Sequence, residues 1–94
     1  MDNDKLLQKI KLSLRIRNST KFDEDIKDHI ESAKLDLNLA GVYFEEYDLL
    51  IIQAIKYYCR ANFALDNKDS LKFTLAYESL KDKLSLCKEY QKNG

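Results

Sequence analysis

The fold of this chain is decided by residues 22–63, which read FDEDIKDHIESAKLDLNLAGVYFEEYDLLIIQAIKYYCRANF. After an acidic start, the stretch places an apolar side chain every three or four residues, which is the spacing of one face of an α-helix. The members of this stripe are Ile26, Ile30, Ala33, Leu37 and Ala40. The spacing therefore predicts a helix that begins near Phe22 and turns this stripe toward a core.

The sequence also predicts where this helix ends. Gly41 is expected to close it, because glycine readily adopts the left-handed conformation that ends many helices. Val42 would then cover the helix end. Leu35 and Leu39 lie off the stripe, so they are expected to face solvent, a second helix or a neighbouring subunit.

A second and far more apolar helix is predicted after a connector at residues 43–47. Asp48 is its expected N-cap, and the helix is expected to run to about Ala64. A helix that is apolar nearly all round is buried on several sides. This helix is therefore predicted to be the central one, or to meet another subunit along one side.

Two further helices are predicted on either side of this pair. The first runs from about Asp4 to Leu14, and the last is capped by Ser70 or Asp69. The stripe of the last helix consists of Phe73, Ala76, Tyr77, Leu80 and Leu84. The chain is therefore expected to be all-α, a small single-domain bundle of about four helices over residues 1–94. Its ordered core is expected at about 4–86, with a polar, frayed tail at 88–94.

Composition supports a helical fold and shows an uneven distribution of charge. The 94 residues are 45% hydrophobic and include no proline and two glycines, so turn-forming residues are scarce. The net charge is zero, but the chain is basic over residues 1–21, acidic over 22–48 and mildly basic after that. Opposite patches suit head-to-tail association. Equally, the acids could serve one helix N-terminus while the bases are simply solvated.

The residues that catalysis or metal binding would need do not converge in the sequence. His29 is the only histidine, and the two cysteines, Cys59 and Cys87, match no metal or redox spacing. A chain with two glycines cannot build a phosphate-binding glycine loop. The chain is therefore predicted not to be an enzyme, and neither a cofactor nor a metal is expected.

No membrane partner is expected either. Acidic residues appear at once near the N-terminus, without the apolar segment of a secretory signal peptide. The longest apolar run, residues 49–52, is far too short to span a bilayer. The chain is expected in the cytosol, where thiols stay reduced.

Two sets of residues are candidates for contacts with other molecules. Candidates for a subunit or partner interface are the off-stripe leucines, the aromatic residues and the acidic helix start: Leu35, Leu39, Tyr43, Phe44, Tyr47, Tyr57, Asp23, Glu24 and Asp25. Candidates for contact with DNA in a lumen or with an acidic partner are Lys9, Lys11, Arg15 and Arg17. The alternatives are that the aromatic residues cover helix ends, and that the charged residues cap helices or face solvent.

Four short motifs follow one another along the chain. They are Phe22-Asp23-Glu24-Asp25-Ile26, Leu39-Ala40-Gly41-Val42, Ala61-Asn62-Phe63 and Tyr77-Glu78-Ser79-Leu80-Lys81. Their order and spacing resemble the phage head-tail connector family, also called adaptor or DNA-packaging proteins, from about Leu6 to Leu84. The loop at residues 43–47 departs from the family pattern in being more aromatic.

The resemblance implies a role in virion assembly. A connector subunit would join a ring of identical copies between the portal and the tail, at the head-tail junction of the virion, after synthesis in the bacterial cytoplasm. Its partners would be further copies of itself, the portal protein and a tail or stopper protein. DNA would pass through the lumen with weak, transient contacts.

Two other functions are compatible with a small helical domain. One is an adaptor or inhibitor that binds a host protein through an apolar groove. The other is a helix-turn-helix regulator, which needs several basic or amide side chains on one exposed helix face. The predicted central helix is too apolar for that role, and the helix before it is acidic.

Overall fold

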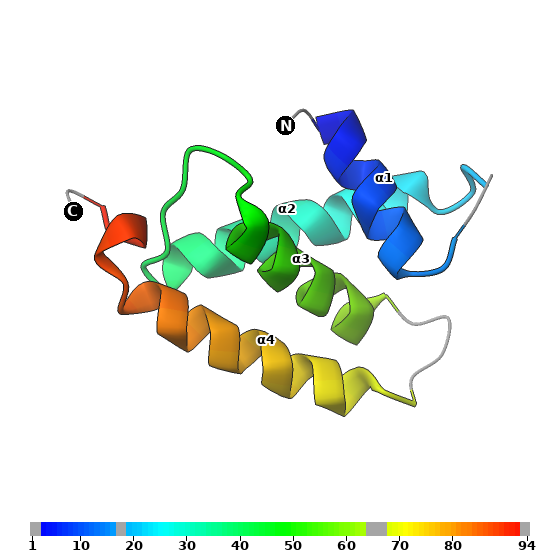
Figure 1. Cartoon of the computed structure of the whole chain (residues 1–94). Helices are drawn as coiled ribbons and strands as arrows, with labels where there is room; N and C mark the ends of the chain where they lie inside the picture. Colours follow the sequence, from blue (N-terminus) through cyan, green and yellow to red (C-terminus); the bar gives the residue numbers. More distant parts are fainter. Residues whose placement is uncertain (1–2, 17–18, 64–67, 93–94) are drawn as a thin grey trace.

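A computed structural model describes residues 3–16, 19–63 and 68–92. Four α-helices and a final 3-10 turn follow one another: α1 (Asn3–Ser13), α2 (Asp23–Leu39), α3 (Leu49–Asn62), α4 (Ser70–Ser85) and η1 (Lys88–Tyr90), as Figure 1 shows. No strand occurs among the described residues. The predicted all-α bundle of four helices is thus confirmed. The expected end of the third helix at Ala64 falls outside the described residues.

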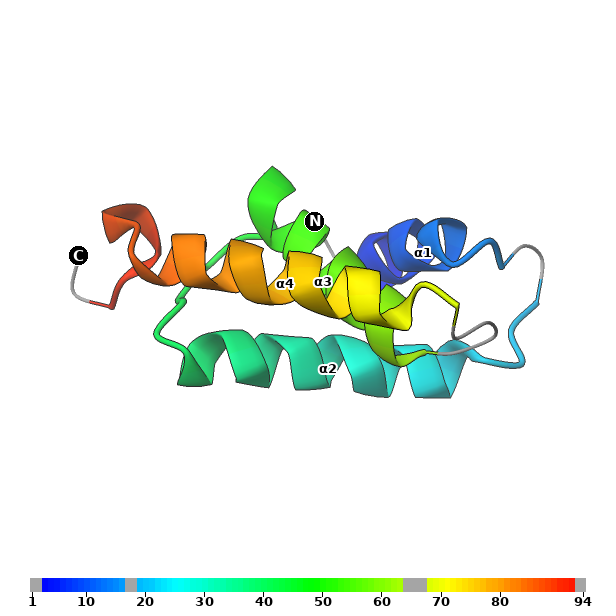
Figure 2. The same cartoon turned by 90° about the horizontal axis from the view of Figure 1, so that it is seen from below.

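The helices form two layers. Figure 2 shows α2 on one side of the molecule, with α1 and α4 on the other. The molecule measures 18 Å along its shortest axis, which is room for about two helices of roughly 10 Å diameter. Helix α3 contacts each of the other three helices, so the prediction of a central apolar helix is confirmed.

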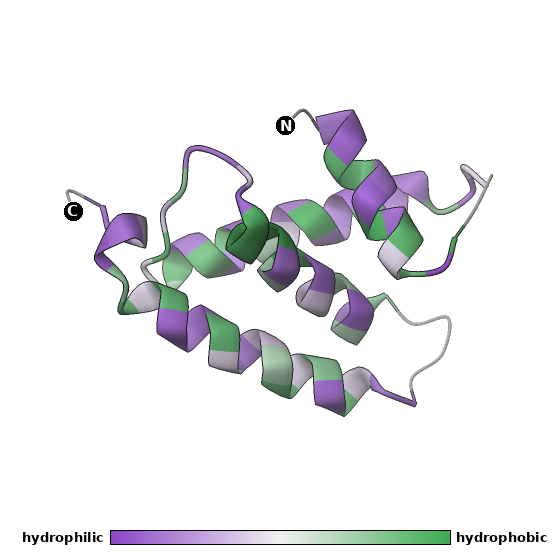
Figure 3. Ribbon diagram, in the orientation of Figure 1, coloured by the Kyte–Doolittle hydropathy of each residue, from purple (hydrophilic) through white to green (hydrophobic). Residues whose placement is uncertain are grey.

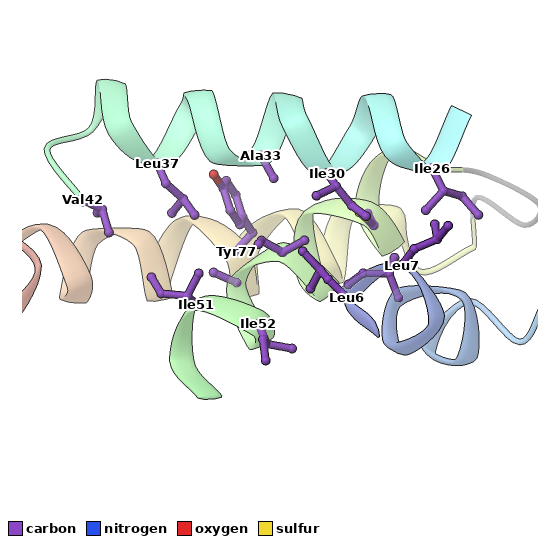
Figure 4. Close-up of a cluster of buried hydrophobic side chains, with 14 of the residues drawn as sticks. Leu6, Leu7, Ile26, Ile30, Ala33, Leu37, Val42, Ile51, Ile52 and Tyr77 are labelled. Carbon is purple, nitrogen blue, oxygen red and sulfur yellow. The ribbon is translucent and has the colours of Figure 1, made fainter. Parts of the chain in front are cut away.

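The core is built from the stripe that the sequence shows on α2. Ile26, Ile30, Ala33 and Leu37 are buried and point toward the other helices in Figure 4, but Ala40 is exposed at the end of the helix. From α3 the core receives Ile51, Ile52, Ala54, Ile55 and Cys59. The first turn of α3 is strongly hydrophobic (Figure 3), yet Leu49 and Leu50 are exposed there.

Gly41 ends α2 as expected. Its φ is +90°, its N–H donates to the carbonyl of Asn38, and the N–H of Val42 donates to that of Leu37. This pair of bonds defines a Schellman motif, which is completed by contact between apolar side chains at its two ends. Val42 and Leu37 are both fully buried, so the motif closes the helix onto the core.

Helix α1 ends in the same way without a glycine. Arg15 has a φ of 62°, its N–H donates to Leu12, and the N–H of Ile16 donates to Lys11. Ile16 is buried, as Val42 is in the first motif. The sequence analysis missed this motif, because arginine does not signal a left-handed residue.

The helix N-termini follow the predictions in part. Asp48 caps α3 as expected, its Oδ1 accepting from the N–H of Ile51 at 3.0 Å. Phe22 occupies the N-cap position of α2, and no side chain caps that helix. At the start of α4, Asp69 also makes no cap bond. The Ser70 hydroxyl instead donates to the carbonyl of Ala61 on α3 at 2.8 Å, so it joins two helices.

The C-terminal segment is not frayed at its start, contrary to expectation. Residues Lys88–Tyr90 form η1, and Tyr90 is only 8% exposed. Its carbonyl accepts from the N–H of Tyr43 at 2.6 Å, and its hydroxyl donates to Asp48 Oδ2 at 2.6 Å. Burial and this bond to a carboxylate raise the pKa of Tyr90 to about 12. Tyr90 thus joins this otherwise polar segment to the 43–48 loop through both its main chain and its side chain.

Candidate interaction surfaces

The outward face of α2 carries the two off-stripe leucines. Leu35 is 63% exposed and Leu39 is 88% exposed. They point away from the core, because the stripe of the same helix faces α3 and the other helices. The sequence left open whether these leucines face solvent, a second helix or a neighbouring subunit. In the single chain, both face solvent.

Of the three acidic residues at the start of α2, one pairs within the chain and two are exposed. Asp23 Oδ1 lies 2.9 Å from Lys11 Nζ, and both side chains are largely shielded from water. Glu24 and Asp25 are exposed, with a loose ion pair of 3.7 Å between Glu24 and Lys27. Glu24 and Asp25 therefore remain surface residues, while Asp23 is used within the chain.

Lys11, one of the candidates for contact with DNA or an acidic partner, is instead paired within the chain. It is 5% exposed, because α1 turns it toward the start of α2, where Asp23 neutralises it. An ammonium group is buried at acceptable cost only when it is paired. Lys9 and Arg15 are exposed, and Arg17 lies outside the described residues.

The aromatic residues of the 43–47 loop mostly cover helix ends. Phe44 and Tyr47 are half-buried against the core, with their ring centroids 5.9 Å apart, and Lys34 lies over the Tyr47 ring. Tyr43 is more open, at 39% exposed. Tyr57 is half-buried on α3, with its ring 6.2 Å from that of Phe73 on α4. Among these four candidates, Tyr43 presents the most surface to a partner.

Further leucines are exposed that the sequence analysis did not select as interface candidates. They lie at the end of α1, at the start of α3, along α4 and just after it: Leu12, Leu49, Leu50, Leu71, Leu75 and Leu86. For Leu71 and Leu75, a position off the stripe of the last helix was the available signal. Single exposed leucines are ordinary on protein surfaces, and these six lie on three different helices and on the segment after α4.

A polar network joins α2 to α4 across the layers. The Tyr77 hydroxyl, which points toward α2 in Figure 4, donates to Asp36 Oδ2 at 2.5 Å, and Lys81 donates to the same oxygen at 2.9 Å. Burial favours the neutral form of Asp36, but these two bonds outweigh it and hold its pKa below the usual value. Sequence reasoning missed this network, because its members lie far apart in the chain.

The sequence of this helical domain matches a known protein family. The sequence model described as phage connector protein matches residues 6–91. The chain belongs to the phage connector protein family. No match is found among curated proteins or among solved structures. The resemblance to phage head-tail connectors is thus confirmed, and the matched region includes η1.

Membership makes this connector a phage structural protein and a component of the virion. The family is structural rather than enzymatic. Cys59 is buried, and that burial raises the pKa of its thiol to about 12, which leaves almost no nucleophilic thiolate. His29 Nδ1 lies 2.6 Å from the carbonyl oxygen of Asp25.

Among residues 3–16, 19–63 and 68–92, no three histidine, cysteine or acidic side chains gather as metal ligands. Within those ranges, no helix has the length and apolar character needed to cross a bilayer.

Proposed function

We propose that this connector is the subunit of a ring that joins the phage portal to the tail and through which DNA passes. The observation that carries this proposal is a family match over nearly the whole chain, combined with exposed leucines on several helices. A subunit of a ring needs two different contact surfaces, one for each neighbour. Mechanism here is assembly, with no chemical step.

The proposed partners follow from this position. The portal protein would contact one end of the ring, and a tail or stopper protein the other. DNA in the lumen would touch the ring weakly, since a chain of zero net charge is expected to displace few of the counterions condensed on DNA. Exposed Lys9 and Arg15 are the described candidates for such contacts.

Native mass spectrometry tests the proposal, on the purified connector alone and after mixing with the portal protein of the same phage. The expected product is a closed ring of about a dozen copies, formed alone or on the portal, because heterologous contacts close into a ring when the rotation between neighbours permits it. A connector that stays monomeric in both samples would contradict the proposal. A stable one-to-one complex with a host protein would then favour the adaptor function.

A further inference from the structure

The end of α1, the end of α3 and the start of α4 lie together at one end of the connector, as Figures 1 and 2 both show. Between them is a pocket of about 180 Å³ that has Arg15, Arg60 and Phe73 in its wall. Arg15 follows α1, Arg60 lies in the last turn of α3, and Phe73 lies on α4. The fold thus brings together two guanidinium groups that are far apart in the sequence.

The aromatic ring of Phe73 lies close to two cations. The guanidinium carbon of Arg60 is 4.1 Å from the centre of this ring, and Nζ of Lys72 is 5.8 Å from it. The ring also packs near Tyr57 of α3, with the two ring centroids 6.2 Å apart. A guanidinium that stacks on an aromatic ring keeps its N–H groups available at its edge, where they can donate two parallel bonds to an oxyanion. We name Arg15, Arg60, Lys72 and Phe73 the Phe73 cluster.

The positive charge of the Phe73 cluster is not neutralised by the part of the chain that the structure describes. Among those residues, no ion pair joins Arg15, Arg60 or Lys72 to a carboxylate. Asp69 is the one acid among the residues that line the pocket. Because like charges repel, an anion that binds beside the three cations lowers their electrostatic energy. The cluster therefore attracts anions.

Most acids of the connector lie elsewhere. Helix α2 carries six of them, whereas α3 carries none. Glu24 and Asp25 begin α2 at the same end of the molecule, but neither lines the pocket, and Figure 2 shows α2 in the other layer from α1 and α4. The Phe73 cluster is thus a basic patch on a chain of zero net charge.

From these contacts we infer that the Phe73 cluster binds phosphate groups of the DNA that passes through the ring. The inference rests on the proposed function, and it names the residues and the ligand chemistry of the DNA contact. Duplex DNA carries one phosphate charge per about 1.7 Å of its axis, so neighbouring phosphates can meet the three cations together. The sequence analysis selected Arg15 for such a contact but missed Arg60 and Lys72, which no local pattern relates to it.

An acidic segment of another virion protein is the rival ligand. One carboxylate is satisfied by a single bidentate arginine, whereas cations contributed by three parts of the fold suit a run of phosphates. The neighbouring Asp69 weakens the attraction, and DNA that moves through a ring needs weak contacts. The arrangement of charge therefore favours DNA over an acidic protein segment.

Binding to duplex DNA at low salt tests the inference on the intact connector. Fluorescence anisotropy of a short labelled duplex of mixed sequence reports the dissociation constant, with connector at up to roughly 1 mM because non-specific dissociation constants reach about 10⁻⁴ M. Lys72→Gln and Arg60→Gln should each weaken binding about fivefold and reduce the slope of log K against log salt by about one. Lys83→Gln removes the same charge from the last turn of α4, and it should leave both values nearly unchanged.

Removal of the one acid in the pocket gives a test in the opposite direction. Asp69→Asn should tighten binding about threefold, because the carboxylate that repels phosphate is lost. Asp82→Asn, at an exposed acid farther along the same helix, changes the net charge equally and should have little effect. Asp69 makes no side-chain cap bond, so its substitution should not weaken α4. Circular dichroism and thermal unfolding check that each variant is folded like the wild type.

The outcomes separate this inference from the proposed function. Losses confined to Lys72→Gln and Arg60→Gln, with a gain in Asp69→Asn, support DNA binding by the Phe73 cluster. Equal effects of the matched controls would show that binding follows net charge alone and would overturn the inference, as would a wild-type connector that binds no DNA. Binding of poly-glutamate through the same residues, without binding of DNA, would also overturn it and assign the cluster to an acidic protein partner.

The ring itself is measured by native mass spectrometry without DNA, so none of these binding results affects that proposal. If wild-type connector forms no ring with or without portal, the proposed function fails. The inference fails with it, because it requires DNA inside the ring.

Discussion

At the scale of single residues, two positions with the same backbone geometry carry very different side chains. Gly41 and Arg15 both have positive φ and both close a helix with a Schellman motif. Glycine adopts this conformation without strain, whereas a residue with a Cβ atom meets the following carbonyl oxygen. The Arg15 position therefore stores strain that the buried Ile16 beside it helps to hold.

Replacing that arginine should stabilise the connector. Arg15→Gly is expected to raise the free energy of unfolding by about 0.5–1 kcal/mol, because relief of strain exceeds the added freedom of the unfolded chain. Thermal unfolding measures the change as a shift of a few degrees. Gly41→Ala is the reverse control. Nothing lies within 4 Å of the added methyl group, so any loss of stability there comes from the backbone alone. A lower melting temperature for Arg15→Gly would show that the arginine side chain contributes more than its backbone costs.

At the scale of elements, one aspartate joins the start of α3 to the C-terminal segment. Asp48 Oδ1 accepts from the N–H of Ile51, and Asp48 Oδ2 accepts from the Tyr90 hydroxyl. The two bonds place η1 against the loop that precedes α3. Local sequence predicted the cap, since an N-cap depends on neighbours along the chain. It could not predict the bond to Tyr90, because that residue is 42 positions away.

Substitutions at these two residues should show this coupling. Asp48→Ala is expected to lower the free energy of unfolding by about 2 kcal/mol, through loss of both the cap and the tyrosine bond. Tyr90→Phe should cost about 1 kcal/mol. The double variant should cost little more than Asp48→Ala alone, because both changes remove the same bond. Chemical denaturation of the four proteins measures these values. Fully additive losses would mean that the bond to Tyr90 adds no stability in solution.

At the scale of the whole molecule, large apolar residues on the helices lie both in the core and on the surface. Ile55 on the central helix is fully buried, whereas Leu35 on α2 is largely exposed. A carboxylate at the first position would be buried without a partner, but at the second it would stay in water. The core and the proposed contact surface are therefore separable by substitution.

Ile55→Asp should unfold the connector at room temperature, because burial of an unpaired charge costs as much as the few kcal/mol by which small domains are stable. Leu35→Asp and Leu39→Asp should keep helicity and a melting temperature within a few degrees of wild type. Circular dichroism during heating distinguishes the two classes. A cooperative transition in Ile55→Asp would refute the central position of α3, and loss of helicity in the leucine variants would show that they stabilise the fold.

The sequence by itself determined the four helices, the closure of α2 at Gly41, the cap at Asp48 and the central place of the apolar helix. Each depends on residues within a few positions of one another, and helix periodicity and capping act over that range. Only the tertiary structure decided that Lys11 is buried against Asp23, that Asp36 binds Tyr77 and Lys81, and that Tyr90 docks on Asp48. These features depend on how the helices pack, and packing brings together side chains that no local pattern relates.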